Sequence, residues 1–345
     1  MTADRGDKGE VVLMGHGGGG SMTDSIISGL ILRELGNPIL EKLDDAACLT
    51  VLESELVMTT DSFVIDPLFY PGGDIGSLAV CGTVNDLAMQ GARPRYLSLA
   101  LIMEEGLPLA DVETIIRSVG DCARRADVII VTGDTKVVET PGGARRAGMF
   151  INTAGLGVRD PGVDVSVSNA RPGDVVIVTG TIGDHGTAIM NVREDLQLES
   201  SLLSDAAPLS GMVMALLDRV PCVHCMRDPT RGGLAAALCD IAGKSDCCVK
   251  IRERLLPVKN EVNGACSILG LDILNVANEG KAVIVCAAGD EKAVLDSLRG
   301  DELGRDACVI GSVSDAPAGM VLMETRAGGE RIVDVPAGID LPRIC

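Results

Sequence analysis

The sequence predicts an α/β protein with mixed sheets, divided into two domains, and three observations carry that prediction. The 345 residues exceed one average domain and suit two domains of about 150 residues each. Short aliphatic segments alternate with longer amphipathic ones along both halves, which is the pattern of strands and helices in α/β proteins. At residues 158–172 this pattern breaks into Pro, Gly and Asp, which is typical of a domain boundary.

The first predicted domain, residues 1–165, alternates strands and helices. Strands are predicted where short aliphatic or β-branched runs are bounded by Gly, Asp or Pro, and these runs are 11–14, 55–65, 95–103, 127–134 and 149–158. Helices are predicted where apolar residues recur with helical spacing, and these segments are 24–35, 74–90 and 109–126.

The second predicted domain, residues 166–335, repeats the mixture. Its predicted strands are 174–180, 281–288, 307–313 and 319–325, and its predicted helices are 207–220, 232–243 and 260–270. Residues 336–345, PAGIDLPRIC, are expected to form a mobile tail that ends in Cys345. Fully extended, that tail spans at most roughly 33 Å.

Composition excludes some classes of protein. The formal net charge of −19 argues against a nucleic-acid partner, because such binding needs clusters of Lys and Arg. The N-terminal residues carry no apolar signal segment, and no apolar run approaches the roughly 18 residues of a membrane span. We therefore expect a cytoplasmic protein without membrane contact, whose core is aliphatic because the chain has no Trp.

The 12 cysteines are scattered through apolar runs such as LAVCGTV and AVIVCAA, so we expect most of them to be buried and reduced. Cys222 and Cys225 in PCVHCMRD have the spacing of half a zinc site. No second pair completes that site, and no structural zinc is expected. Whether these two thiols bind another metal or form a disulfide is left open.

The glycine run GHGGGGSMTDSII allows three interpretations. Gly15, Gly17 and Gly20 fit the GxGxxG pattern of a dinucleotide-binding turn, since they follow a predicted strand and precede a predicted helix. A flexible loop is a second interpretation. A third is a glycine flap that lays backbone N–H groups over phosphates.

Several carboxylates stand where predicted strands end or helices begin. They are Asp45, Asp61, Asp86, Asp134 and Asp228. A single such residue usually caps a helix or forms a turn. A set of them beside Gly, Thr or Asn also suits Mg²⁺ held between carboxylates and phosphates.

Three further motifs carry charges beside glycines. RDPTRGG sets two arginines before a predicted helix N-terminus, an arrangement that favours an anion as well as a simple cap. Lys136 in TGDTK and Glu279 in NEGK are either surface charges or functional groups, and taken singly the motifs leave both open.

Taken in order, eight motifs resemble the HypE family of hydrogenase maturation factors. They are HGGGG, TTDSFVIDPLFYPGGDIG, VNDLAMQGA, TGDTKVVE, GDHG, RDPTRGGLA, NEGK and the terminal PRIC. The resemblance runs from about residue 14 to Cys345, and DPLFYPGGDIG and PRIC are its most specific parts. The Gly-rich and Asp-Thr motifs alone indicate only the wider superfamily of aminoimidazole ribonucleotide synthetase and selenophosphate synthetase.

The resemblance implies a two-domain fold of the aminoimidazole ribonucleotide synthetase type, with an N-terminal domain that forms a homodimer and with ATP and Mg²⁺ bound where the domains meet. It implies a carbamoyl dehydratase: Cys345 receives a carbamoyl group from HypF, and ATP drives its dehydration to a thiocyanate. It also implies that the cyanide passes to iron on a HypC–HypD complex, as a ligand of NiFe hydrogenase.

Residue roles follow from the matching motifs in the same way. The resemblance implies that Cys345 carries the reacting group and that Lys136 and Glu279 polarise or deprotonate it. The implied ATP contacts are Gly17, Gly18, Gly19, Gly20, Asp61, Asp86, Asp134, Thr135, Asp228 and Arg231. The implied metal ligands are Asp45, Asp61, Asp86, Asp134 and Asp228. His16 and His185 lie in matching motifs as phosphate contacts or as loop-stabilising residues, whereas CVHC departs from the family pattern.

Two hypotheses from other classes stay open at this point. One is a nicotinamide-dependent oxidoreductase that uses GHGGGG as its dinucleotide loop. The other is a non-catalytic assembly scaffold with a reactive tail.

Overall fold

The computed structural model describes residues 20–21, 24, 28, 41, 43, 47–51, 54–138, 148–195, 202–220 and 222–335. The predicted strand 11–14, the body of the predicted helix 24–35 and the predicted tail 336–345 lie outside these residues. Within the described residues, no helix is long and apolar enough to cross a membrane.

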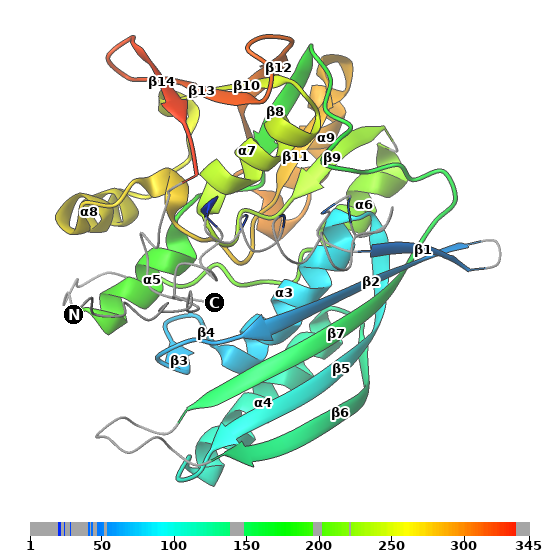
Figure 1. The fold of residues 1–345 in the computed structure, drawn as a ribbon, viewed down its shortest axis with the longest axis vertical. Helices are drawn as coiled ribbons and strands as arrows, with labels where there is room; N and C mark the ends of the chain where they lie inside the picture. The colour runs from blue at the N-terminus through cyan, green and yellow to red at the C-terminus, as the bar shows by residue number, and fades with distance from the viewer. Residues whose placement is uncertain are drawn as a thin grey trace, which may run out of the picture.

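The first half of the chain forms a five-stranded mixed sheet in the order β1-β2-β7-β5-β6 (Figure 1). Its strands are β1 (Ala47–Val51), β2 (Ser54–Phe63), β5 (Ala92–Glu104), β6 (Ile129–Val138) and β7 (Met149–Arg159). Helices α3 (Ile75–Met89) and α4 (Leu109–Arg125) pack against one face, and a small hairpin, β3 (Phe69–Tyr70) with β4 (Gly73–Asp74), precedes α3. The predicted strands and helices between residues 55 and 158 are thus confirmed.

The second half forms a seven-stranded sheet in the order β14-β13-β10-β12-β8-β11-β9. Its strands are β8 (Asp174–Val178), β9 (Val223–Arg227), β10 (Cys248–Arg252), β11 (Val283–Ala287), β12 (Cys308–Ser314), β13 (Met320–Glu324) and β14 (Glu330–Val333). Its helices are α5 (Asp184–Arg193), α6 (Ser210–Arg219), α7 (Gly233–Lys244), α8 (Asn260–Leu269) and α9 (Glu291–Arg299), with short 3-10 turns at Glu253–Leu255, Ile273–Asn275, Ala288–Asp290 and Glu302–Gly304.

Strand β8 shows why this second sheet is buried on both faces. Val176 and Val178 pack in a core with α7, whereas Val175 and Ile177 pack in a second core with α6 and α9. A strand covered on both sides reads as a continuous apolar run rather than an alternation. The run VVIV is therefore the sequence signal of a central strand.

Helix α3 lies between the two sheets (Figure 1). It begins after Pro-Gly-Gly because Asp74 caps it, accepting hydrogen bonds from the N–H groups of Gly76 (2.7 Å) and Ser77 (3.0 Å). Almost every residue of α3 is buried, and its last residues, Ala88 and Met89, belong to the core of the second half. A helix that is apolar on all sides is a buried one, so α3 is the element that the two halves share.

The segment 202–209, which we call the strap, also contacts both halves. Ser204 N–H donates to the carbonyl of Pro71, 2.8 Å away. From α3, the side chain of Asn85 donates to Ala207 O (3.1 Å) and accepts from Leu209 N–H (2.7 Å). The strap therefore fixes the second half of the chain to the first.

Gly280 is expected to tolerate no side chain, because an added Cβ would lie 1.8 Å from the carbonyl oxygen of Asp205 in the strap. Gly280→Ala must displace the strap, and we expect it to lower the free energy of unfolding by about 1–3 kcal/mol. Gly264→Ala is the control: its added Cβ meets nothing within 4 Å on α8, so it should stabilise by about 0.5–1 kcal/mol. Urea unfolding of both variants checks this, and an unchanged midpoint for Gly280→Ala would contradict it.

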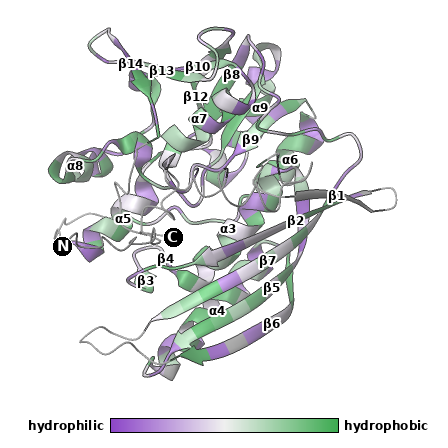
Figure 2. Ribbon diagram, in the orientation of Figure 1, coloured by the Kyte–Doolittle hydropathy of each residue, from purple (hydrophilic) through white to green (hydrophobic). Residues whose placement is uncertain are grey.

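The face of the five-stranded sheet opposite α3 and α4 mixes apolar and polar residues (Figure 2). One row across four strands runs Met58, Leu156, Tyr96 and Ile129 by strand register. Met58, Tyr96 and Ile129 are 43%, 48% and 63% exposed. We call the whole side of the sheet on which this row lies the open face.

The described cysteines are free thiols, and most are buried, as predicted. Cys222 is exposed, whereas Cys225 is fully buried on β9 beside the core of α7. Burial raises the pKa of the Cys225 thiol to about 12, which keeps it protonated. Within the described part of the chain, these two thiols form neither a disulfide nor part of a metal cluster.

Candidate functional site

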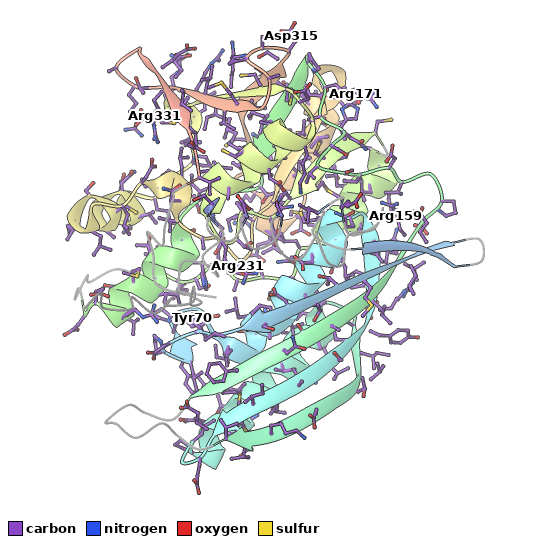
Figure 3. All side chains as sticks on the ribbon, in the orientation of Figure 1. Tyr70, Arg159, Arg171, Arg231, Asp315 and Arg331 are labelled. Carbon is purple, nitrogen blue, oxygen red and sulfur yellow. The ribbon has the colours of Figure 1, made fainter. Side chains whose placement is uncertain are left out.

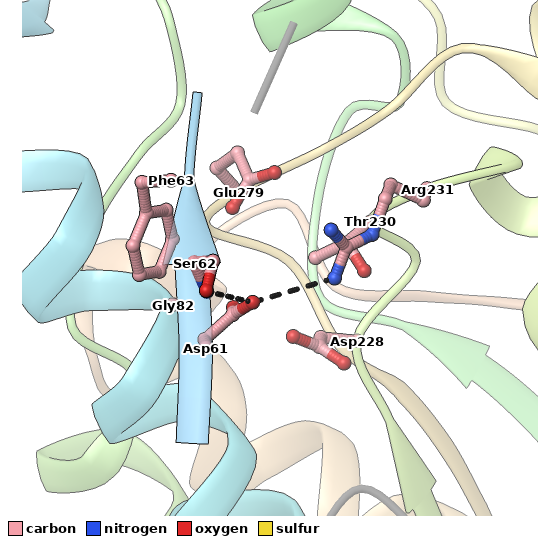
Figure 4. Close-up of a pocket in the computed structure, with 8 residues that line it drawn as sticks. All are labelled: Asp61, Ser62, Phe63, Gly82, Asp228, Thr230, Arg231 and Glu279. Carbon is pink, nitrogen blue, oxygen red and sulfur yellow. Dashed lines mark hydrogen bonds and ion pairs between the residues drawn. The ribbon is translucent and has the colours of Figure 1, made fainter. Parts of the chain in front are cut away.

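A small pocket, partly open to solvent, lies between the two halves, beside α3 (Figure 4). Four separate segments build its wall: the end of β2, the middle of α3, the loop between β9 and α7, and the loop before β11. The lining residues are Asp61, Ser62, Phe63, Gly82, Asp228, Thr230, Arg231 and Glu279. Three sequence motifs far apart in the chain, TTDSF, RDPTRGG and NEGK, thus meet at one place.

Asp61 and Arg231 join the two halves across this pocket (Figure 4). Figure 3 shows the place of Arg231 in the whole molecule. Arg231 Nη2 lies 3.5 Å from Asp61 Oδ1, an oxygen that also accepts the N–H of Ser62 at 2.9 Å. Asp228, at 7% exposure, comes from the same loop as Arg231. The pocket therefore holds two carboxylates that can bind a cation and a guanidinium that can bind an anion.

The two glycines after Arg231 explain how the loop reaches the pocket. Gly232 and Gly233 have φ angles of +76° and +61°, in the left-handed region that other residues avoid. A Cβ on Gly233 would lie 2.4 Å from the carbonyl oxygen of Leu274. The RGG motif is thus required for a tight turn that starts α7 against its neighbour.

Glu279 is a buried acid of the pocket, and the pKa of its carboxyl is strongly raised. It is 3% exposed, and its Oε1 atom has no hydrogen-bond partner among the described residues. Burial raises the pKa of its carboxyl well above the ordinary value, and the charges of Asp228, Asp205 and Asp61 raise it further, whereas Arg231 opposes them. Such a carboxyl is a strong base once ionised, and a nearby cation would favour its ionised form.

Asp86 stands next to this pocket on α3. Thr59, two residues before Asp61 on the same face of β2, donates its hydroxyl to Asp86 Oδ2 at 2.7 Å. Gly82 lets α3 come close, because an added Cβ would lie 2.8 Å from the Phe63 ring and 3.6 Å from Asp61 Oδ2. The structure therefore brings Asp61, Asp86, Asp228, Arg231 and Glu279 into one region, as the motifs suggested.

Asp134 and Lys136 lie elsewhere in the single chain. Both are on β6, at the far edge of the sheet, where Lys136 Nζ is 3.4 Å from Asp134 Oδ2 and both side chains are more than half exposed. Register places Asp134 in the row of Ala100, Asn152 and Ser62, so it faces away from Asp61. About 14 Å of sheet separates β6 from β2. Both belong to the open face, and the side chain of Thr135 lies outside the described residues.

The other predicted positions are described in part or not at all. Gly20 is buried, whereas Gly17, Gly18 and Gly19 lie outside the described residues, as do His16, Asp45 and Cys345. His185 is fully buried on α5: its Nδ1 lies 2.8 Å from Ser204 Oγ, and its ring packs edge-on against Tyr70. That contact supports a loop-stabilising role for His185.

Three buried polar residues near the pocket were not predicted. They are Asn85 and Asn278, which are buried as whole residues, and Asp205, whose side chain is 3% exposed. Asn278 Oδ1 accepts the N–H of Gly183 (2.7 Å) and its Nδ2 donates to Pro229 O (3.0 Å), so it ties the Glu279 loop to the Asp228 loop. Asn85 and Asn278 stand directly before Asp86 and Glu279 in VND and NEG, and that adjacency was the available signal. Asp205 had no such neighbour.

The pocket residues suit a Mg²⁺ ion that a phosphate also binds, rather than a metal ion held by protein side chains alone. The described residues include no group of three or more His, Cys, Asp or Glu side chains already arranged to hold a metal ion. Mg²⁺ needs only one or two carboxylates when phosphates and water supply the remaining ligands. Asp61 and Asp228 offer that donor set, Arg231 adds a phosphate contact, and Glu279 Oε1 has no hydrogen-bond partner among the described residues.

Two family models and a set of named relatives match the chain. The model of the AIR synthase related protein N-terminal domain matches residues 43–159, and that of the C-terminal domain matches residues 171–323. The chain is 48% identical over 334 residues to carbamoyl dehydratase HypE of Azotobacter vinelandii, covering 97% of each chain. The division of the domains at residue 165 stays a prediction.

Two solved structures are similar over nearly the whole chain. A HypE–HypF complex contains a chain that superposes with a TM-score of 0.84 at 44% identity, over 90% of this chain and 100% of that one. A HypE structure in complex with ATP superposes with a TM-score of 0.81 at 46% identity, over 97% of this chain and 100% of that one.

Proposed function

Because the chain belongs to the AIR synthase related family, and within it to the HypE carbamoyl dehydratases, we propose that it dehydrates a carbamoyl group on the Cys345 thiol at the expense of ATP. The observation that carries the proposal is the meeting of Asp61, Asp228, Arg231 and Glu279 in one pocket of such a chain. The product would be a thiocyanate, the source of a cyanide ligand for the iron of NiFe hydrogenase.

The proposed reaction needs ATP because the carboxamide oxygen is a poor leaving group. Transfer of the terminal phosphoryl group to that oxygen makes an ester that leaves as phosphate. The C–O bond breaks, the two N–H protons are lost, and the carbon–nitrogen bond becomes triple. Thiocarboxamide and ATP thus give thiocyanate, ADP and phosphate, and the thiolate remains a leaving group for later cyanide transfer.

The pocket residues divide this work. Asp61 and Asp228 would hold Mg²⁺, with Asp86 next to them, and Arg231 would bind a phosphate oxygen. When bound, Mg²⁺ neutralises charge on the phosphates during transfer. Glu279, with its unpartnered oxygen, would accept a proton from the carboxamide nitrogen.

Lys136 and Asp134 need a second copy of the chain in this account. They lie on the open face, whose exposed Met58, Tyr96 and Ile129 suit contact with another protein surface. We propose that the open face forms the homodimer and that Asp134 and Lys136 act at the site of the second copy. Lys136 would then polarise the carboxamide oxygen.

The partners follow from the relatives. One of the similar structures is a HypE–HypF complex, which supports HypF as the carbamoyl donor for Cys345. A HypC–HypD complex as the acceptor of the cyanide, and the cytoplasm as the location, remain parts of the proposal. The hypothesis of a nicotinamide-dependent oxidoreductase is not supported, because the family models that match the chain are those of AIR synthase related proteins.

Asp228→Asn is expected to weaken the Mg²⁺-dependent binding of ATP by about 10- to 100-fold. The substitution removes one of the two pocket carboxylates that are proposed to hold Mg²⁺. Titration calorimetry with ATP, with and without Mg²⁺, measures the effect. Asp296→Asn is the matched control: Asp296 forms an exposed pair with Lys292 on α9, and its loss should leave ATP affinity unchanged. Equal affinities for Asp228→Asn and the control would remove Asp228 from the metal site.

A further inference from the structure

The main chain of Glu279 is held from both sides by side chains that do not line the pocket. Its N–H donates to Asp205 Oδ1 at 3.1 Å. Its carbonyl oxygen accepts a hydrogen bond from Asn85 Nδ2 at 3.2 Å. The two side chains belong to different parts of the fold, since the acceptor Asp205 lies on the strap and the donor Asn85 lies on α3.

Asn85 uses nearly all of its hydrogen-bonding capacity at this place. The residue is 1% exposed, and besides the carbonyl of Glu279 it binds the strap at Ala207 O and Leu209 N–H. The next residue on α3 is Asp86, which accepts a hydrogen bond from the hydroxyl of Thr59 beside the proposed site. One rigid turn of α3 thus sets the spacing between Asp86 and the main chain of Glu279.

Asp205 fixes the other side of Glu279 and is itself fixed. The residue has a side chain that is 3% exposed, and its Oδ2 lies 3.3 Å from Lys281 Nζ, which is also largely buried. Lys281 Nζ further donates to the carbonyl of Gly280 at 3.3 Å. A buried ion pair of this kind favours one geometry strongly, because either charge alone would be costly.

We propose that Asn85 and Asp205 are positioning residues for Glu279. They hold its main chain against α3 and the strap, so that its carboxyl keeps a fixed distance from the group bound at Asp61, Asp86 and Asp228. This inference rests on the proposed function, in which Glu279 accepts the proton. A displacement of about 1 Å at a reacting group can cost roughly 100-fold in rate, so loosening this support should slow the chemical step more than it weakens ATP binding.

Two substitutions of Asp205 grade the loss. Asp205→Asn can keep the acceptor for the N–H of Glu279 but removes the charge that faces Lys281, whereas Asp205→Ala removes both contacts. Asn85→Ala releases the carbonyl of Glu279 from the α3 side. The rate is measured in single turnovers: full-length protein carbamoylated on Cys345 is mixed with Mg²⁺ and ATP, and cyano-group formation is followed by intact mass.

Asp272 provides the matched control, because it makes the same two kinds of contact away from the pocket. Its Oδ1 accepts the N–H of Leu274 at 3.1 Å, and its Oδ2 pairs with Arg331 at 2.7 Å. Asp272→Asn and Asp272→Ala should lower thermal stability yet leave the turnover rate at the wild-type value. A purely structural role for Asp205 predicts the same result for its own variants.

We expect the rate to fall about 10-fold for Asp205→Asn and about 100-fold for Asp205→Ala and Asn85→Ala, with ATP affinity within about twofold of wild type. Wild-type rates in the Asp205 variants would overturn the inference, and so would a loss of ATP affinity that matches the loss of rate. If the alanine variants fail to fold, Asp205→Asn decides.

Glu279→Gln separates failure of this inference from failure of the proposed function. If Glu279→Gln turns over at the wild-type rate, the proposed role of Glu279 is wrong and the inference fails with it. If Glu279→Gln is slow while the Asp205 and Asn85 variants are normal, only the positioning role is wrong.

Discussion

Deletion of Cys345 alone is expected to abolish formation of the cyano group completely while leaving ATP binding and folding at wild-type levels. The proposed chemistry needs a thiolate that carries the carbamoyl group and later releases cyanide. Most of the described thiols are buried and cannot take its place, whereas Cys222 is exposed and is tested separately. The measurement is a mass-spectrometric assay of the product after incubation with HypF, carbamoyl phosphate and ATP.

Cys222→Ser is the control for that deletion. Cys222 is an exposed thiol, so its substitution tests whether any accessible cysteine serves as the carrier. We expect this variant to form the cyano group at the wild-type rate. Product from the chain that lacks Cys345 would contradict the account, because another group would then carry the carbamoyl group.

Glu279→Gln is expected to reduce the single-turnover rate of dehydration by about 10²–10⁴-fold, the usual contribution of a general base. The amide keeps the size of the carboxyl but cannot accept the proton. ATP affinity should change little by comparison. A rate within about threefold of wild type, in a variant that still binds ATP, would show that another group removes the proton.

The same substitution is expected to change how stability depends on pH in the absence of ATP and Mg²⁺. The raised pKa of Glu279 in the folded protein means that the protonated carboxyl contributes its full stability below the unfolded pKa of about 4.3. That contribution is lost as the pH rises through the raised folded value. In thermal unfolding, the stability of Glu279→Gln should therefore differ least from that of wild type near pH 4. As the pH rises, the variant should gain stability relative to wild type.

Sequence patterns sufficed for elements whose signal is local. The strand VVIV and the helix α3 can each be recognised from a short stretch of sequence. Both are buried on all sides, so their residues are mostly apolar. The strands VHCMR and CVKIR were missed, since His, Arg and Lys interrupt their apolar patterns. Each becomes a strand through pairing with partners distant in sequence, β11 for the first and β12 and β13 for the second.

Site residues could be predicted where they belong to a recognisable motif. They could not be predicted where their role depends on tertiary contacts. Asp61, Asp228 and Glu279 could be chosen from motifs that resemble a family. Asp205 could not, because its importance comes from the strap that folds over Gly280 and Glu279. The separation of Lys136 from the pocket was equally unpredictable, since it depends on which edge of the sheet β6 occupies and which face the residue takes.

The central claim is that Cys345 carries the group that ATP dehydrates, and intact-protein mass spectrometry with peptide mapping tests it most directly. The protein is incubated with HypF and carbamoyl phosphate, and then with Mg²⁺ and either ATP or a non-hydrolysable analogue. The account predicts a carbamoyl adduct on Cys345 that loses the mass of one water only with hydrolysable ATP. An unmodified Cys345 in the presence of active HypF, or loss of water without ATP, would contradict it.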